Sequence, residues 1–299
     1  MKIKIATKIY NEEYYIDYFI KYHLESGIDE IHIFDAASDD KSLKIIKKWQ
    51  EKTDRVKLIE SNIELRLTTD QHETAVCNKI FKHAVDEQIK NKDDCWWIFP
   101  DIDEFINLAN DELFTFLSKA KEDIIRCVFF EWYVHPEKKD ILYPIEKMLE
   151  MAQKGELKGR IVYIFTDPFY KDYLVRINQD NFEKFKNVQT YSGNHRFILK
   201  SKVIVPPNEP SMIIHHLRGG SKKIIMERIN RRLSILESTN EWGNFTHFNE
   251  RSEEINNYDS FYKSLYTLDK LLKQKEETIN YNNKASRYNL FINSQRLQN

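Results

Sequence analysis

The residues best suited to chemistry in this chain follow an apolar, aromatic run. Residues 96–105 have the character of a buried strand that ends in carboxylates, namely Asp101, Asp103 and Glu104. Carboxylates gathered at the end of a core strand are costly unless positive charge lies beside them. A divalent cation with oxygen ligands, often shared with a phosphate, is the usual source of that charge. The pattern predicts an enzyme that handles a nucleoside diphosphate through a metal.

Asp101 and Asp103 are two positions apart, and this spacing has a geometric consequence. If the backbone is extended through both residues, their carboxylates point the same way. One could then bind the metal while the other acts through water or a ribose hydroxyl. The alternative is a solvated acidic turn, because Asp-x-Asp is common by chance. We favour the site because the pair directly follows a strand.

A further acidic position, Asp35, ends an earlier apolar run. Its carboxylate could accept hydrogen bonds from a nucleobase or from ribose hydroxyls. The alternative is a helix cap, supplied by one of the residues that follow, Ser38, Asp39 or Asp40. Both can hold at once, since capping uses only one of these groups.

Two adjacent histidines, His215 and His216, end a late strand. Neutral imidazole is a good ligand for Mn²⁺-type ions. Because neighbouring strand residues face opposite sides, at most one of the two can reach the site. The turn after them, Arg218 to Ser221, adds a cation and glycine amides suited to a diphosphate. A purely structural role for the histidines is the alternative.

The elements that must position these residues alternate along the first hundred residues. Apolar periodicity predicts strands over 2–7, 30–34, 56–60 and 95–99, with helices near 16–24, 43–49 and 75–85. Gly27 is placed to end the first helix. This alternation predicts an α/β fold with a parallel sheet, whose ligands bind beyond the carboxyl ends of the strands. Later strands are expected at 124–130, 161–165, 197–199, 203–205 and 212–216, followed by helices over 225–236 and 252–273.

Composition bounds the class of protein. The chain has 299 residues, 41% of them hydrophobic, and a formal net charge of −1, which argues against a general nucleic-acid binder. Cys77, Cys95 and Cys127 lie in apolar surroundings without paired spacing, so we expect reduced core cysteines. We see no signal peptide and no run of about 20 apolar residues, and expect a cytoplasmic protein.

Taken together, the motifs resemble family-2-like glycosyltransferases, and most closely the bacterial group related to family-92 enzymes. The resemblance rests on Asn11-Glu12, the loop Asp35 to Asp40, the Trp96 to Phe105 segment, and the strand ending in His216 with Ser221 after it. It implies a GT-A fold over residues 1–221, with a helical extension over 222–299. It also implies a nucleotide-sugar donor, most simply a UDP-sugar, and Mn²⁺ or Mg²⁺. The acceptor would be a glycan or lipid-linked molecule in bacterial surface polysaccharide synthesis.

The same resemblance implies roles for individual residues. Asp103 and His216 would bind the metal, and Asp101 would touch the metal, a metal-bound water or the ribose. The donor would be bound by residues at the strand ends, namely Thr7, Asn11, Glu12, Asp35, Asp101 and Arg218. The departures from the family's pattern are Ala36, where Asn is common, and residues 131–136, where a glycine-rich segment is expected.

Several interpretations stay open. In an inverting transfer a carboxylate takes the proton of the acceptor hydroxyl, and Glu131 is our first candidate, with Asp167 and Asp172 as alternatives. A nucleotidyltransferase or a metal-dependent phosphohydrolase would also gather carboxylates at strand ends. A catalytically degenerate partner of another transferase is the non-enzyme alternative. Basic residues on the helix after Lys222 leave room for peripheral membrane association, at the inner face of the membrane.

Overall fold

The computed structural model describes residues 1–66, 70–106, 110–135, 137, 141–161, 163–164, 167–168, 170–191, 196–199, 202–203, 212–219, 224–227, 230, 258–267, 269–271 and 273. Its helices are α1 (Ile16–Glu25), α2 (Ser42–Lys52), η1 (Ile63–Leu65), α3 (Asp70–Asn91), α4 (Asn110–Lys119), α5 (Ile145–Gln153), α6 (Phe182–Phe185) and α9 (Tyr258–Ser264). Its strands are β1 (Lys2–Ile9), β2 (Glu30–Asp35), β3 (Val56–Ser61), β4 (Cys95–Ile98), β5 (Glu104–Ile106), β6 (Ile124–Tyr133), β7 (Lys158–Ile161), β8 (Tyr163–Ile164), β9 (Asp167–Pro168), β10 (Tyr170–Ile177), β11 (Val188–Tyr191), β12 (Arg196–Leu199), β13 (Lys202–Val203) and β14 (Met212–Gly219).

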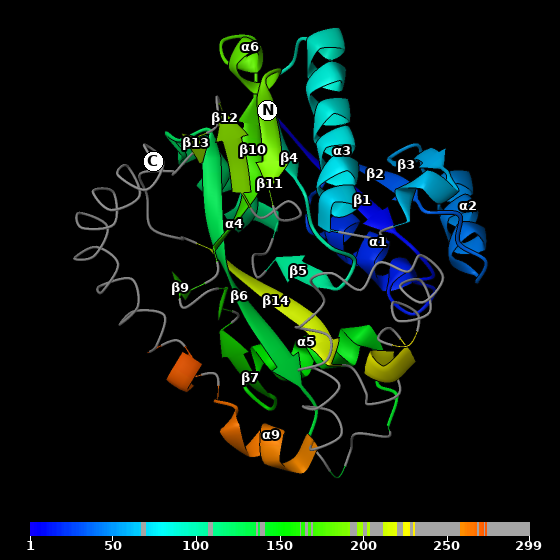
Figure 1. Cartoon of the computed structure of the whole chain (residues 1–299), viewed down its shortest axis with the longest axis vertical. Coiled ribbons are helices and arrows are strands. Elements are labelled where there is room, and N and C mark those ends of the chain that lie inside the picture. Colours follow the sequence, from blue (N-terminus) through cyan, green and yellow to red (C-terminus); the bar gives the residue numbers. More distant parts are fainter. Residues whose placement is uncertain are drawn as a thin grey trace.

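A central sheet of nine strands organises the described part of the chain (Figure 1). Its order is β3-β2-β1-β4-β10-β6-β14-β5. The ninth strand, β7, pairs with the last residues of β6, on the edge opposite β14 and beyond the part of β6 that pairs with β10. Strands β1 to β4 pair in parallel, and β6 and β14 also pair in parallel with each other. Strand β10 is antiparallel to both β4 and β6, so β6 and β14 run in the same direction as β1 to β4. The short strands β5 and β7 run the opposite way.

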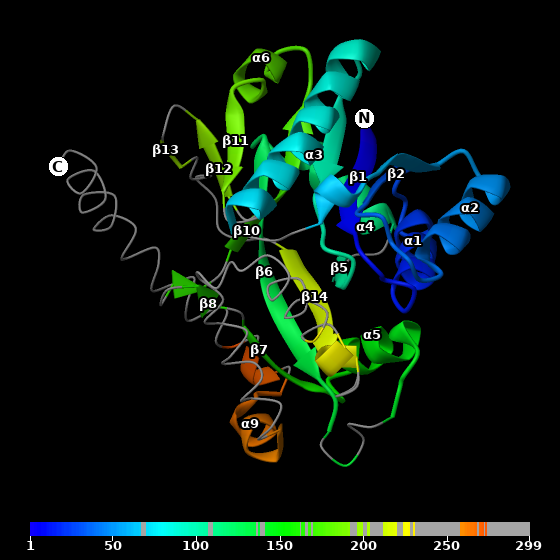
Figure 2. The same ribbon diagram turned by 45° about the vertical axis from the view of Figure 1, so that its right-hand side comes forward.

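Helices cover both faces of this sheet, as two views of the ribbon show (Figures 1 and 2). Alternation along the strands decides which residue meets which layer. Ile3 and Ile5 of β1 pack in the core that contains α1, α2, α4 and α5, whereas Ala6 packs in the core that contains α3 and α6. The second core also receives residues of β11 and β12, which form a separate three-stranded sheet with β13.

The first helix illustrates how local sequence sets an element. Its buried residues include Ile16, Phe19 and Ile20, spaced to line one face. The helix ends at Glu25, and Gly27 follows with a φ of 84°, a left-handed conformation that favours glycine. The prediction that Gly27 ends this helix is confirmed.

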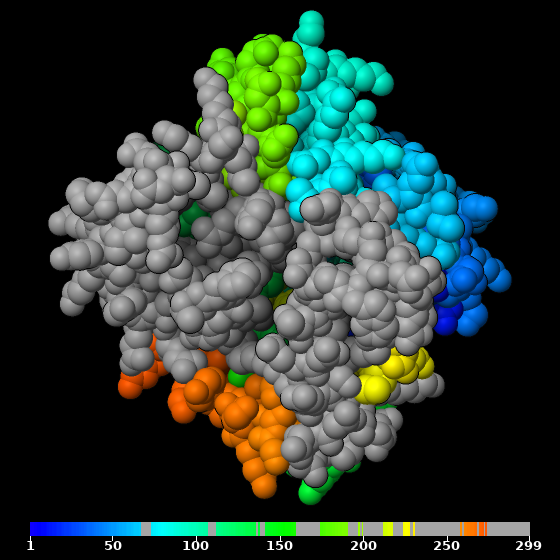
Figure 3. Space-filling model, in the orientation of Figure 1, coloured from blue at the N-terminus to red at the C-terminus, as the bar shows by residue number. Residues whose placement is uncertain are grey.

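The far end of the described chain packs against the lower part of the sheet. Helix α9 lies at the opposite end of the molecule from α6 in the ribbon and space-filling views (Figures 1 and 3). Tyr266, just after α9, exchanges two backbone hydrogen bonds of 2.8 Å with Gly159 of β7. No helix within the described ranges is long and apolar enough to cross a membrane.

The α/β class and the parallel arrangement of the first four strands are as predicted. The sequence analysis did not predict the helices η1, α4, α5 and α6, nor the strands β5, β9, β10 and β11. The strand expected over 161–165 is replaced by β7, which ends at Ile161, and by the two-residue β8. Of the strand at 203–205, residues beyond 203 lie outside the described ranges, as does most of the helix expected over 225–236. The helix expected over 252–273 is not continuous: α9 ends at Ser264, and Tyr266 then forms a β-bridge with Gly159. The division at residue 221 therefore stays a prediction.

Candidate active site

The order of the strands singles out one place on the sheet edge. The chain runs from β1 outward to β2 and β3, then returns to place β4 on the other side of β1. The carboxyl ends of β1 and β4 therefore lie side by side, with connections leaving in opposite directions. Ligands of open α/β sheets bind in the crevice at such a switch point. Residues 10–12 follow β1 here and residues 99–103 follow β4.

Thr7 joins the two strand ends. Its hydroxyl donates a hydrogen bond of 2.8 Å to the backbone carbonyl of Pro100, and the residue is 1% exposed. Pro100 immediately precedes Asp101, so this contact holds the start of the acidic segment against β1. Thr7 therefore lies at the predicted site, and its hydroxyl bonds the protein backbone. Direct binding of the donor by Thr7 stays a prediction.

The acidic segment is a turn, which corrects one assumption of the sequence analysis. Strand β4 ends at Ile98, and the backbone is not extended from Asp101 to Asp103. Instead, the carboxylate of Glu104 accepts a hydrogen bond of 2.8 Å from the Asp101 amide, and the Glu104 amide donates one of 3.1 Å to the Asp101 carbonyl. A reciprocal pair of this kind fixes a tight turn. The turn, rather than strand alternation, therefore aims the two aspartates.

Asp103 meets His216 at this edge. The Asp103 Oδ2 atom lies 3.2 Å from His216 Nε2, and both residues are buried. A backbone hydrogen bond of 2.8 Å from the Leu217 amide to the Asp103 carbonyl holds the turn against β14. The other ring nitrogen, His216 Nδ1, lies 3.9 Å from Oε1 of Glu131. The fold thus brings together three residues that the sequence analysis named from three distant segments.

His215 faces away from this group, as strand alternation predicted. Its Nδ1 accepts a hydrogen bond of 2.9 Å from the indole N–H of Trp132. Burial lowers the pKa of His215 to about 4, so its ring is neutral near pH 7. The described contacts of His215 are structural, and His216 is the member of the pair that reaches Asp103.

Asp35 lies at the end of β2 and is fully buried. Its Oδ2 accepts hydrogen bonds from the Ser61 hydroxyl at 2.6 Å and from the Ser38 amide at 3.1 Å. A short polar side chain that bonds a backbone amide a few residues on shapes a local turn. Asp35 therefore holds the loop after β2, and its direct contact with a nucleoside stays a prediction.

Asn11 and Glu12 are tied to the same loop. Asn11 has a left-handed φ of 54°, and its amide donates to the Ser38 hydroxyl at 2.9 Å. Its side-chain oxygen accepts from the Asp39 amide at 2.9 Å, and the Glu12 amide donates to the Ser42 hydroxyl at 2.9 Å. The loops after β1 and β2 therefore form one connected rim beside the switch point.

The sequence analysis missed a lysine at this edge. Lys8 precedes the last residue of β1, and its Nζ lies 2.9 Å from Glu73 Oε1 and 3.8 Å from Cys77 Sγ. Burial works to lower the pKa of Lys8, but the neighbouring Cys77, Glu73 and Asp101 outweigh it and raise that pKa. Lys8 therefore stays charged, and Asp101 is one of the groups whose negative charge favours this. Its position near the end of a strand was the available signal.

The donor set can be compared with the needs of a divalent cation. No group of three or more His, Cys, Asp or Glu side chains in the described segments is arranged to hold a metal by itself. Mn²⁺ and Mg²⁺ are, however, commonly held by one or two protein ligands together with phosphate oxygens of the substrate. A carboxylate and an imidazole 3.2 Å apart, among several buried acidic residues, fit such a site.

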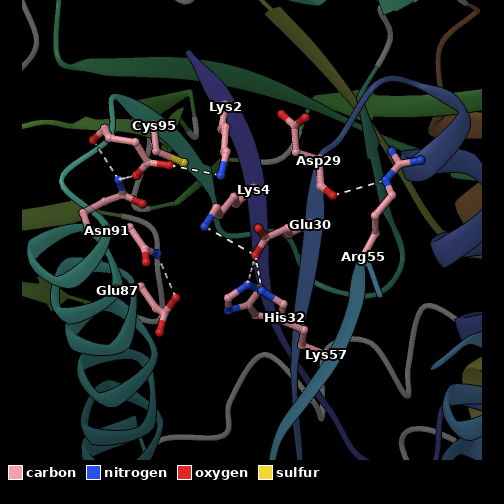
Figure 4. Close-up of polar contacts among 12 residues, drawn as sticks. Lys2, Lys4, Asp29, Glu30, His32, Arg55, Lys57, Glu87, Asn91 and Cys95 are labelled. Atoms are coloured by element: carbon pink, nitrogen blue, oxygen red, sulfur yellow. Dashed lines mark hydrogen bonds and ion pairs between the residues drawn. The ribbon is translucent and has the colours of Figure 1, made fainter. Parts of the chain in front are cut away.

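A second polar cluster near the amino ends of β1 and β2 makes a useful contrast (Figure 4). Glu30 lies 2.5 Å from Lys57 Nζ and 3.3 Å from the buried Lys4 Nζ, and its Oε2 lies 2.9 Å from His32 Nε2. Burial works to raise the pKa of Glu30, but the bonds from Lys57 and His32 and the charge of Lys4 lower it to about 2. This carboxylate finds its positive partners within the protein, and the cluster is structural.

Some predicted positions lie outside the described residues. These are the side chains of Arg218, Asp167 and Asp172, together with Gly220 and Ser221. All three cysteines are buried with free thiols, as expected for core residues.

No protein-family model matches the chain, and no curated protein matches its sequence. Several solved structures are similar to it at low identity. Mannosyltransferase PcManGT from Pyrobaculum calidifontis, in complex with GDP-Man and Mn²⁺, is 12% identical with a TM-score of 0.39, over 99% of this chain and 80% of that protein. S. aureus TarS is 14% identical with a TM-score of 0.37, over 83% of this chain and 45% of that one. Glucosyl-3-phosphoglycerate synthase from Mycobacterium tuberculosis, in complex with Mn²⁺, UDP and glucosyl-3-phosphoglycerate, is 15% identical with a TM-score of 0.28, over 52% of this chain and 51% of that one.

Proposed function

We propose that this chain is a metal-dependent glycosyltransferase of the GT-A fold. It transfers a sugar from a nucleoside-diphosphate donor, with a UDP-sugar as the expected donor, to a glycan or lipid-linked acceptor. We expect inversion at the transferred carbon and a role in bacterial surface polysaccharide synthesis, at the cytoplasmic face of the membrane. The observation that carries the proposal is the 3.2 Å approach of Asp103 to His216 beside the switch point of the sheet.

The chemistry of the site supports this proposal. Breaking a glycosidic bond to a nucleoside diphosphate leaves negative charge on the leaving group, and a bound Mn²⁺ or Mg²⁺ would stabilise that charge. Asp103 and His216 would hold the ion, and Lys8, which pairs with Glu73, adds a positive charge whose field reaches Asp101. Glu104 keeps the Asp101 turn closed through its two hydrogen bonds with that residue.

The rim formed by residues 10–12 and 35–39 would bind the nucleoside. Asp35 acts by holding the loop after β2, while Asn11 and Glu12 join that loop to β1. Asp101 would meet the ribose or a metal-bound water. Arg218, which belongs to β14 and follows His216 by two positions, would meet the diphosphate.

A donor screen tests this function. Purified protein is incubated with Mn²⁺ and a panel of UDP-, GDP- and CMP-sugars, and the released nucleotide is identified with and without EDTA. Metal-dependent release of a nucleoside diphosphate from one donor supports the proposal. Release of the sugar 1-phosphate with transfer of the nucleoside monophosphate would instead indicate a nucleotidyltransferase. Release of both the sugar 1-phosphate and the free nucleoside monophosphate would indicate a phosphohydrolase. Absence of both nucleotide binding and release would indicate a degenerate partner.

Asp103→Asn tests the metal ligand within the same assay. Removing one charge that holds the cation should lower turnover on the order of 100-fold and weaken Mn²⁺ binding measured by calorimetry. Asp54→Asn is the matched control, because Asp54 is exposed and lies before the amino end of β3. The proposed site lies at the opposite, carboxyl ends of the strands. Equal Mn²⁺ affinity in the Asp103 variant and the wild type would contradict the ligand assignment.

A further inference from the structure

The backbone just after His216 lies where the regular pairing of the central sheet ends. In the pairing of β14 with β5, His216 is the last residue and lies opposite Glu104. In the pairing of β14 with β6, the register shifts between His216 and Gly219, and neither register includes Leu217. A shift of this kind is a β-bulge, and bulges next to functional sites redirect side chains. The position of His216 therefore depends on how the bulge itself is held.

Two hydrogen bonds hold the bulge at Leu217, which is fully buried. The Leu217 amide donates to the Asp103 carbonyl at 2.8 Å, and the Leu217 carbonyl accepts from the Tyr15 hydroxyl at 3.0 Å. Buried backbone groups that leave a sheet ladder need partners of this kind. The first bond ties the residue after His216 to Asp103, the other member of the proposed metal-binding pair. The second bond comes from a different element, the start of α1.

Tyr15 is itself firmly held. The residue immediately precedes α1 and is 1% exposed, so its ring is packed within the core. Its amide donates a hydrogen bond of 2.9 Å to the carbonyl of Glu12, which belongs to the rim formed by residues 10–12 and 35–39. Tyr15 therefore connects that rim to the strand that carries His216, although Tyr15 and Leu217 are 202 positions apart in the sequence.

We propose that Tyr15 is a positioning residue, which holds the Leu217 backbone and thereby sets the position of His216 relative to Asp103. This inference rests on the proposed metal-dependent function, which supplies the purpose of the pair. Its physical content, the support of one backbone segment by one hydroxyl, can be measured without metal or donor.

The neighbouring Tyr14 provides a matched control. Its hydroxyl also donates to a backbone carbonyl, that of Tyr143, which lies two residues before α5. Tyr14→Phe and Tyr15→Phe therefore make the same chemical change in adjacent residues, and both variants keep the aromatic ring. The bond lost in Tyr15→Phe adjoins His216, whereas the bond lost in Tyr14→Phe lies near α5. A difference between the two variants thus separates positioning from a general loss of stability.

Hydrogen exchange of the Leu217 amide, followed by NMR in metal-free protein, is the first test. The amide should be protected in the wild type, and Tyr15→Phe should speed its exchange about 10-fold relative to that of Ile214, which lies within both pairings of β14. In Tyr14→Phe, the two amides should keep their wild-type ratio. Rapid exchange of Leu217 in the wild type would overturn the inference even if a variant does not fold, and so would an unchanged ratio in Tyr15→Phe.

Mn²⁺ binding by calorimetry is the second readout. Tyr15→Phe should weaken it about 10-fold, whereas Tyr14→Phe should retain the wild-type affinity. Wild-type affinity in Tyr15→Phe, or an equal loss in both variants, would make the Tyr15 bond purely structural and overturn the inference. Failure of the wild type to bind Mn²⁺, with or without UDP or GDP, would overturn the proposed function, while the exchange ratio would still decide whether Tyr15 holds the backbone after His216.

Discussion

Replacing Thr7 by valine tests the contact that joins β1 to the acidic turn. The Thr7 hydroxyl is buried and donates a hydrogen bond of 2.8 Å to the Pro100 carbonyl. Valine replaces that hydroxyl by a methyl group of similar size, so no large cavity forms. The main cost is the lost bond and a buried carbonyl deprived of this donor, which amounts to about 1–3 kcal/mol. We therefore expect the free energy of unfolding to fall by about that amount.

The assay is urea denaturation followed by tryptophan fluorescence, with the midpoint and the slope compared between the two proteins. An unchanged slope with a lower midpoint indicates a change in stability alone. Thr115→Val is the control, because Thr115 is exposed on α4 and valine and threonine have similar helix propensities. That control should lie within about 0.5 kcal/mol of the wild type. If Thr7→Val were as stable as the control, the contact would not hold the strand ends together.

Three further predictions concern stability. Gly159→Ala should lower the free energy of unfolding by about 1–3 kcal/mol through overpacking, because its Cβ would meet the Glu131 carbonyl at 2.5 Å; thermal unfolding measures this. Gly27→Ala should cost about 1 kcal/mol because an alanine is strained at a φ of 84°, and urea denaturation would detect it. Burial lowers the pKa of His23 to about 4, and its bond to the Phe19 carbonyl only partly opposes this. The unfolded chain then binds more protons below pH 6.5, so stability is full above that pH and falls by about 2 kcal/mol toward pH 5. His23→Phe should remove this share of the loss when unfolding is measured at pH 7, 6 and 5, and an unaltered pH profile would refute the assignment.

Local pattern was sufficient for the first part of the fold. In strands β1, β2 and β4, residues of the first core (Ile5, Ile33 and Ile98) alternate with residues of the second core (Ala6, Phe34 and Trp97). The intervening helices show regular apolar spacing. These signals are short-range, so they can be recognised in the sequence without knowledge of the tertiary structure. The same reasoning identified Asp101, Asp103 and His216, because each follows or ends an apolar strand.

The second part of the sheet could not be predicted in this way. Strand β10 inserts antiparallel between β4 and β6, and its partners lie far from it in the sequence. The register of such pairings depends on long-range contacts, which local periodicity does not specify. Helices α4 and α5 were missed as well, although their buried residues, such as Leu117 and Met148, belong to the main core.

The sequence by itself determined the kinds of residue available to the site, the α/β class, and the rule that His215 and His216 face opposite sides. The family resemblance already implied that His216 joins Asp103, whereas the tertiary structure alone decided that Asp101 to Glu104 forms a turn and that Glu131 lies beside His216. The physical reason is that Glu131 and His216 meet only when β6 pairs with β14. The turn depends on the bond from the Asp101 amide to the Glu104 carboxylate. Chain segments distant in sequence become neighbours only once the sheet has formed.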